Sequence, residues 1–185
     1  MGLYSRNKGK RGERLWASFC REQGYDVHRT AQYRGNTGAA GDVEGLPYIH
    51  CEVKYVQALS IAKAMEQSER DADAAGKDEF PIVASKRAKE PWLVTMRALD
   101  WLSMIGLYEE LDNVHTAFKP QEKFSIRKEL ERAKELLYPK GDIVALRYDR
   151  GDFHLATMYA EDWFTLYREW EAGMDLKRRA EREEH

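Results

Sequence analysis

The stretch from Gly41 to Tyr55 constrains the fold most, because it has the pattern of two short strands joined by a Gly-Leu-Pro turn. Asp42 stands at the start of the first strand, and Glu52 and Lys54 stand near the end of the second. Side chains alternate between the two faces of a strand, so Glu52 and Lys54 are expected to point the same way. A turn that brings two carboxylates to one end of a sheet, beside an ammonium group, predicts a site for a hard divalent cation.

The donor set matches the preferences of one cation in particular. Two carboxylates, one backbone carbonyl and several waters suit Mg²⁺, and Mn²⁺ is expected to substitute for it. The carbonyl of Val53 is the predicted third donor, because Val53 lies between the two side chains that face the metal. Lys54 would orient or help to activate an attacking water and would offset the charge that develops on a phosphate. The predicted reaction is therefore hydrolysis of a phosphodiester bond.

Simpler interpretations exist for each residue of this set. Glu52 and Lys54 could form an exposed ion pair on an edge strand, worth at most ~1 kcal/mol. Asp42 could be an ordinary turn residue after a glycine. His50 shares the face of Glu52 and could touch a substrate or a metal, but a polar filler position is the simpler expectation. Gln67 might line the site from the following helix, and a solvated helix residue is the favoured interpretation.

The distribution of charge adds a second clue. The 185 residues carry a net charge of −2, yet residues 1–34 hold eight basic against three acidic side chains. A local excess of five positive charges suits contact with phosphates, and a solvated charged helix explains it equally well. The residues expected to contact DNA phosphates are Lys8, Lys10, Arg11, Arg29 and Arg34.

Periodicity predicts an α/β arrangement with one main domain. Helices are expected over 8–23, 60–75 and 98–107, and strands over 25–30, 80–85 and 92–96, with a glycine-rich loop at 32–41. We divide the chain into a core at 1–111, a linker at 112–121, an extension at 122–172 and a charged tail at 173–185. The two cysteines, Cys20 and Cys51, are expected to be reduced core residues. No apolar run reaches the ~20 residues of a membrane span, so a cytoplasmic protein without a membrane partner is expected.

The extension repeats part of the core. Ile82-Val83-Ala84 recurs at 143–145, and the spaced pattern from Thr95 to Trp101 recurs from Thr157 to Trp163. Helix, hairpin and helix are therefore expected twice, over 60–106 and over 122–172, and coincidence is the alternative. The second copy lacks counterparts of Asp42, Glu52 and Lys54, so one catalytic centre per chain is predicted.

The ordered set of residues resembles the PD-(D/E)xK nuclease superfamily, with Asp42 followed by Glu52-Val53-Lys54 as the (D/E)xK element. Glu13, within the run Lys8 to Glu13, occupies the place of the carboxylate that many members carry on the N-terminal helix. That run looks like the opening of archaeal-type and phage Holliday junction resolvases, so a phage-encoded protein is one possibility. Gly41 stands where the family pattern has a proline. The match covers about residues 8–105.

The resemblance implies a restriction-endonuclease-like core with a mixed central β-sheet flanked by helices, followed by an α-β-β-α extension. It also implies a Mg²⁺-dependent endodeoxyribonuclease that acts on branched DNA as a homodimer and uses no small-molecule cofactor. Asp42, Glu52, Lys54 and Glu13 are the implied catalytic residues. Two alternatives remain open at this point. One is a related nuclease that acts on duplex, single-stranded or foreign DNA, and the other is a nucleic-acid-binding or assembly protein that keeps the fold without cleavage.

Overall fold

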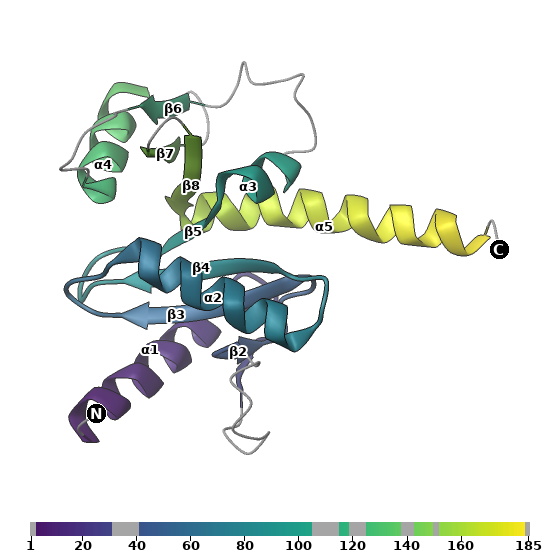
Figure 1. Cartoon of the computed structure of the whole chain (residues 1–185), viewed down its shortest axis with the longest axis horizontal. Helices are drawn as coiled ribbons and strands as arrows, with labels where there is room; N and C mark the ends of the chain where they lie inside the picture. The colour runs from purple at the N-terminus through teal and green to yellow at the C-terminus, as the bar shows by residue number, and fades with distance from the viewer. Residues whose placement is uncertain are drawn as a thin grey trace. The chain divides into compact units, whose positions relative to one another are not determined.

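The computed structural model describes residues 3–30, 41–104, 115–118, 125–137, 143–149 and 152–183 (Figure 1). The chain forms two compact units, Met1–Arg97 and Ala98–His185. This division falls earlier than position 111, where the sequence places the end of the core. The reason is that helix α3 (Ala98–Met104) packs against elements of the second unit, strand β8 (Asp152–Tyr159) and helix α5 (Ala160–Glu183).

The first unit is built around a mixed sheet in which the strands lie in sequence order. These strands are β1 (His28–Arg29), β2 (Val43–Glu44), β3 (Ile49–Tyr55), β4 (Phe80–Lys86) and β5 (Leu93–Arg97). All neighbouring pairs are antiparallel except β3 and β4, which are parallel. A parallel pair needs a crossover connection, and helix α2 (Ile61–Ala75) supplies it. The predicted α/β class with a mixed, helix-flanked sheet is confirmed, and this is the arrangement expected of a restriction-endonuclease-like core.

Two helices pack against opposite faces of β3. Helix α1 (Leu3–Glu22) lies on the face of Tyr55, which is in close contact with Gly12. Helix α2 lies on the face of Glu52, to which its Gln67 is hydrogen-bonded. The alternation of side chains along a strand explains why residues three positions apart meet different helices. Helix α2 ends at Gly76, whose φ of +64° is the left-handed conformation favoured at a helix C-terminus.

The predicted hairpin between β2 and β3 is present, with Val43 opposite Cys51 in an antiparallel pair. Its turn requires a glycine at position 45, where φ is +114°. A Cβ added to Gly45 would lie 2.2 Å from the carbonyl oxygen of Asp26, so the chain passes too close for any side chain. The turn therefore fixes the positions of both strands that carry the predicted site.

The second unit holds α3, β8 and α5 together with three further elements. These are β6 (His115–Phe118), α4 (Ile126–Leu137) and β7 (Ile143–Asp149). Strand β6 is parallel to β7, and β7 is antiparallel to β8. Strand β6 lies inside the segment 112–121 that the sequence describes as a linker, whereas α5 continues as a helix through most of the predicted tail.

The same order of elements occurs twice in the chain. The series β3, α2, β4, β5, α3 has its counterpart in β6, α4, β7, β8, α5. Strand pairing aligns the copies, because the row Glu52–Val83–Thr95 corresponds to the row Ala117–Ala145–Thr157. This register gives an offset of 62 residues for both strands of the hairpin, so the Ile-Val-Ala match in the sequence is one residue out of step. The position that corresponds to Glu52 is held by Ala117.

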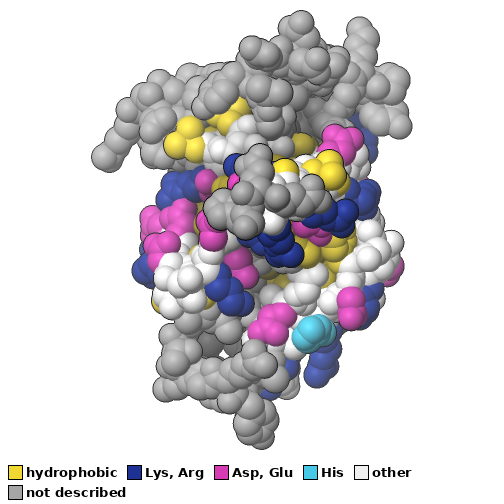
Figure 2. All heavy atoms as spheres, turned by 90° about the vertical axis from the view of Figure 1, so that its right-hand side faces the viewer, with side chains coloured by type: hydrophobic (Ala, Val, Ile, Leu, Met, Phe, Trp, Pro, Cys, Tyr) yellow, Lys and Arg dark blue, Asp and Glu magenta, His cyan; other side chains and the backbone are white. Residues whose placement is uncertain are grey.

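Corresponding residues of the two series are buried to the same extent. Thr95 and Thr157 are each 1% exposed, and Trp101 and Trp163 are 2% and 1% exposed. In the first unit Trp16 and Cys20 are fully buried, and both cysteines are free thiols, as predicted. Acidic and basic side chains are interspersed over the face in Figure 2, in keeping with a net charge near zero. Among the described helices, none is long and apolar enough to cross a membrane.

Candidate active site

Asp42 is held at the edge of β3 by the backbone. The Asp42 N–H donates to the carbonyl of Cys51 at 3.0 Å, and the Val53 N–H donates to Asp42 Oδ2 at 2.8 Å. The N–H and the C=O of one strand residue point to the same edge, so the Val53 carbonyl lies on the side of β3 that faces Asp42. The two predicted donors on this edge are thus brought together by hairpin geometry.

Glu52, Lys54 and Gln67 form a closed triangle on the face of β3 that packs against α2. Lys54 Nζ forms an ion pair with Glu52 Oε1 and donates to Gln67 Oε1 at 3.1 Å. Gln67 Nε2 donates in turn to Glu52 Oε1 at 3.0 Å. The Glu52 side chain is only 7% exposed, so this is a buried arrangement rather than a surface ion pair on an edge strand. The amide of Gln67 fixes the positions of both charged groups.

Electrostatics link Asp42 to two other acids. Burial, together with the negative charges of Glu52 and Glu13, raises the pKa of Asp42 from its ordinary value of 3.8 to about 7. The Val53 N–H and Lys54 oppose this shift without cancelling it. A carboxyl group that titrates near neutrality beside a second carboxylate is a concentration of negative charge that a cation would relieve.

The donors present fit Mg²⁺. Among the described residues, each of the two carboxylates uses one oxygen in hydrogen bonds, Oδ2 of Asp42 and Oε1 of Glu52, which leaves Asp42 Oδ1 and Glu52 Oε2 for a cation. No group of three or more His, Cys, Asp or Glu side chains that could hold a metal ion occurs in that part of the chain. Mg²⁺ needs no such cage, because it is bound by one or two carboxylates and keeps several waters. Asp42, Glu52 and the Val53 carbonyl would hold it.

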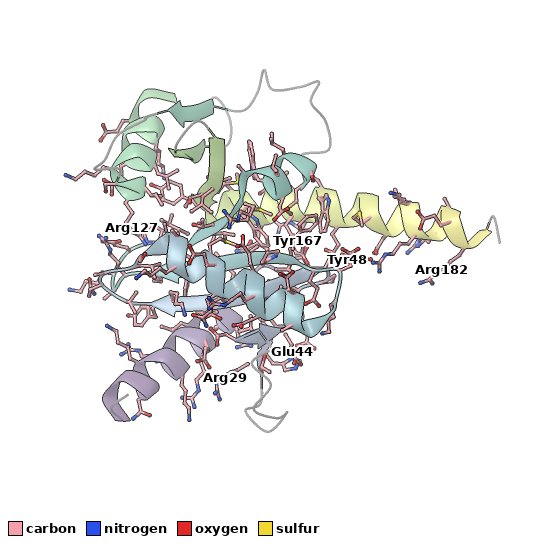
Figure 3. All side chains as sticks on the ribbon, viewed as in Figure 1. Arg29, Glu44, Tyr48, Arg127, Tyr167 and Arg182 are labelled. Atoms are coloured by element: carbon pink, nitrogen blue, oxygen red, sulfur yellow. The ribbon has the colours of Figure 1, made fainter. Side chains whose placement is uncertain are left out.

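Glu13 and Arg29 are paired with each other. Arg29, labelled in Figure 3, reaches from β1 to Glu13 on α1, and the two side chains form an ion pair with exposures of 25% and 15%. The effect of Glu13 on the pKa of Asp42 places its charge near the site. Arg29 was predicted from the sequence as a phosphate contact, and in this structure it neutralises the carboxylate of Glu13.

The remaining predicted DNA contacts differ in their surroundings. Lys8 and Arg11 line a pocket beside Tyr55, and Lys10 lies on the same helix. No ion pair with an acidic side chain is formed by these three residues within the described part of the chain. Arg34 falls outside the described residues.

Gln67 differs from the simpler sequence interpretation of a solvated helix residue, whereas His50 agrees with that of a packed polar residue. Gln67 is a partner of both charged residues of the motif, which the sequence could signal only through its place on the helix after β3. His50 is 3% exposed and lies 3.8 Å from Glu79, and burial lowers the pKa of its imidazole. His50 thus belongs to the packing between β3 and its surroundings, and no contact joins it to Asp42.

A comparison with solved structures finds a similarity to a DNA-processing enzyme. The structure is similar to that of Hjc, a Holliday junction resolvase from the archaeal hyperthermophile Archaeoglobus fulgidus, with 25% sequence identity and a TM-score of 0.36. The similarity covers 47% of this chain and 70% of that chain. No protein-family model and no curated protein matches the sequence.

Proposed function

We propose that the chain is a PD-(D/E)xK nuclease, a Mg²⁺-dependent endodeoxyribonuclease that hydrolyses phosphodiester bonds in branched DNA, as a Holliday junction resolvase does. One observation carries the proposal. Asp42, held at 2.8 Å by the Val53 N–H, lies where the charge of Glu52 acts on it, and Glu52 in turn is ion-paired with Lys54. A structural ion pair would not require a second buried carboxylate beside it.

Each residue has a distinct task in this mechanism. Bound Mg²⁺ would lower the pKa of a coordinated water and stabilise the negative charge that develops on the phosphate in the transition state. Asp42 and Glu52 present oxygens toward the cation, and the backbone of Val53 orients Asp42. Lys54 holds its ammonium group beside Glu52, where it can orient the attacking water and offset phosphate charge. Gln67 keeps Lys54 and Glu52 in a fixed relation.

The test is a cleavage assay with labelled four-way junction, flap, single-stranded and plain duplex DNA, each with Mg²⁺, with Mn²⁺ or with EDTA. We expect metal-dependent cutting that is fastest on branched DNA. We also expect Glu52→Ala and Lys54→Ala to abolish cutting while junction binding persists. Matched controls are Glu66→Ala and Lys63→Ala, which remove the same charges from exposed positions of α2 and should cut normally.

The outcomes separate the candidate functions. Equal cutting of duplex and junction would exclude the resolvase and leave a related nuclease for duplex or foreign DNA. Binding of DNA without cutting of any substrate in either metal would exclude the enzyme and leave a nucleic-acid-binding protein. Normal cutting by either of the Glu52 and Lys54 variants would show that the site lies elsewhere.

A further inference from the structure

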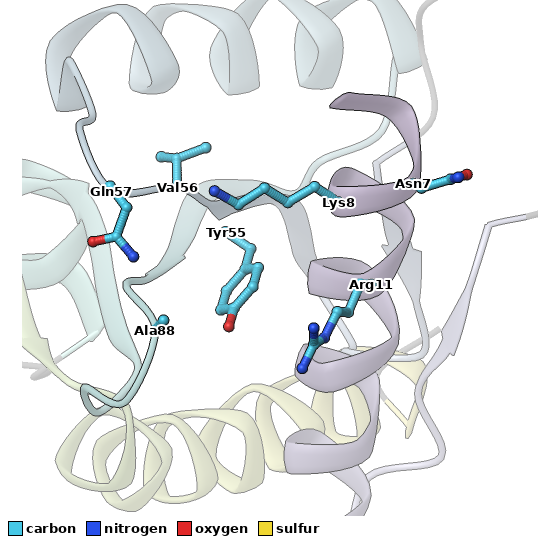
Figure 4. A pocket seen from close by; sticks show the side chains of 7 residues that line it. All are labelled: Asn7, Lys8, Arg11, Tyr55, Val56, Gln57 and Ala88. Atoms are coloured by element: carbon cyan, nitrogen blue, oxygen red, sulfur yellow. The ribbon is translucent and has the colours of Figure 1, made fainter. Parts of the chain in front are cut away.

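A pocket of about 310 Å³ opens beside the end of β3, between α1 and the turn that joins β4 to β5. Figure 4 shows Lys8 and Arg11 reaching from α1 toward the ring of Tyr55, with Gln57 and Ala88 on the other side. Tyr55 directly follows Lys54 in the chain, and its side chain lies on the opposite face of β3 from those of Glu52 and Lys54. The proposed roles of those residues make no use of the pocket.

The lining combines an aromatic ring with two cations. Lys8 Nζ lies 6.0 Å from the centre of the Tyr55 ring, which is the far limit of a cation–π contact, so the ammonium stands off from the ring. Arg11 is exposed, and neither cation is matched by an acidic side chain among the described residues. Two such positive charges at the mouth of a pocket favour a phosphate group as their ligand.

The ring is held in place by its own helix contact. A Cβ added to Gly12 would lie 2.5 Å from the Cβ of Tyr55, so α1 passes the strand at this point with no room between them. Tyr55 is therefore fixed at its base while part of its side chain remains exposed. A rigid, partly exposed aromatic ring is a platform on which a nucleic-acid base stacks without regard to its identity.

We propose that this pocket binds one unpaired nucleotide of the substrate strand, with its phosphate on Lys8 and Arg11 and its base stacked on Tyr55. The proposal rests on the proposed function, because it takes the substrate to be DNA, and it adds a reason for a preference for branched DNA. A plain duplex offers no unpaired base, whereas bases at a branch point can leave the stack. None of the lining residues is a buried polar group that could hydrogen-bond to the edge of a base. We therefore expect the pocket to bind a nucleotide within a strand that other contacts hold in place, rather than a free nucleotide.

The test measures binding alone, in EDTA, and so does not depend on cleavage. Junction and flap DNA carry 2-aminopurine at successive positions near the branch, and its fluorescence reports stacking on protein. We expect one position to change on binding, Tyr55→Leu to abolish the change and weaken binding roughly five- to 150-fold, and Tyr55→Phe to preserve both. The double variant Lys8→Gln/Arg11→Gln should reduce the slope of log K against log salt by about 0.7 if the pair contacts one phosphate.

Arg70→Gln is the matched control for charge, because Arg70 is exposed on α2 and does not line the pocket. It should leave the fluorescence signal unchanged. The proposal is overturned if no position responds in a Tyr55-dependent way, or if Arg70→Gln weakens binding as much as the double variant Lys8→Gln/Arg11→Gln. Displacement of the signal by a deoxynucleoside monophosphate at equal nucleotide concentration would also overturn it and would indicate a site for a soluble nucleotide. A protein that binds in this way without cutting DNA would keep this inference while excluding the proposed function.

Discussion

Gln67 connects two charged side chains that lie two residues apart on β3. Glu52 and Lys54 could pair in several rotamers, but the amide of Gln67 accepts from Lys54 and donates to Glu52, which leaves one arrangement. Side chains that orient catalytic or ligating groups commonly account for 10- to 100-fold in activity or metal affinity. The residue is a positioning residue, since its contacts are with these two side chains.

Replacement of Gln67 by leucine should therefore slow single-turnover cleavage of a junction by roughly 10- to 100-fold without unfolding the protein. Lys54 would lose one acceptor, and its ammonium would become free to leave Glu52. The pH profile of cleavage should shift as well, because the charges that surround Asp42 would move. Lys63→Leu on the exposed side of the same helix serves as the control, and an equal loss in that variant would contradict a positioning role.

The pKa of Asp42 predicts how stability depends on pH in the metal-free protein. The folded state raises this pKa from 3.8 to about 7, so the folded state binds the proton more tightly than the unfolded chain does. The stabilisation is complete below pH ~4 and is lost as the pH rises through about 7. The free energy of unfolding, measured by urea titration in EDTA, should fall over this range. In Asp42→Asn the fall should be smaller, and an identical pH dependence in both proteins would contradict the assignment.

The sequence alone predicts the positions of side chains that follow from strand alternation or from a turn. Alternation along β3 placed Glu52 and Lys54 on one face, and the turn placed Asp42 beside them. Gln67 could not be ranked in the same way, because its contact depends on how α2 packs across a parallel pair of strands. The pairing of Arg29 with Glu13 was missed for a similar reason, since 16 residues separate them and no periodic pattern links a strand to a preceding helix.

At the scale of elements, the contact between α1 and β3 fixes the base of Tyr55 and so one wall of the pocket. It depends on Gly12, where a Cβ would lie 2.5 Å from the Cβ of Tyr55. Gly9, one turn earlier, faces only the Glu13 carboxylate, at 3.7 Å from an added Cβ. The two glycines of the same helix thus differ in packing but share the same backbone geometry.

Gly12→Ala should lower the free energy of unfolding by about 1–3 kcal/mol, because a close-packed contact must open. Gly9→Ala should raise it by about 0.5–1 kcal/mol, because alanine favours the helix and meets no obstacle. Urea denaturation of both variants checks the pair. The two expected changes have opposite signs, and stabilisation by both substitutions would contradict the close contact.

Periodicity predicted most helices and strands, and the differences have local causes. Helix α1 begins at Leu3, five residues before the predicted start at position 8. The prediction missed these residues because they carry no apolar stripe from which periodicity could indicate a helix. Strand β1 is shorter than the predicted 25–30, since the Val27 N–H turns back to the carbonyl of Tyr25 at 2.8 Å. Strand β6 has four residues, which is too few for an alternating pattern to stand out.

At the scale of the whole molecule, the same series of strands and helices occurs twice, but the residues that we propose to be catalytic occur in the first unit alone among the described residues. The row that contains Glu52 in the first copy contains Ala117 in the second. If the proposed activity is correct, symmetric cutting of a junction on two opposed strands needs two chains. The number of cuts per binding event then reports the number of intact centres.

A mixing experiment tests this expectation. Wild-type protein combined with an excess of Glu52→Ala should convert a cruciform plasmid mainly to nicked circles, because most pairs that contain a wild-type chain would hold one intact centre. Wild-type protein alone should produce linear plasmid. Gel separation of the two products gives the ratio, and an excess of Glu66→Ala, which keeps the site, is the control. An unchanged ratio in the presence of Glu52→Ala would show that one chain makes both cuts.

The register between the two copies has a consequence for how such a chain can diverge. A strand position that carries a buried acid is constrained by chemistry and reduces stability, whereas its duplicate is constrained only by the fold. Ala117 and Thr157 occupy one row of the second copy, where the first has Glu52 and Thr95. The second series thus has the buried threonine that packs in the sheet but lacks the acid to which we assign the chemistry.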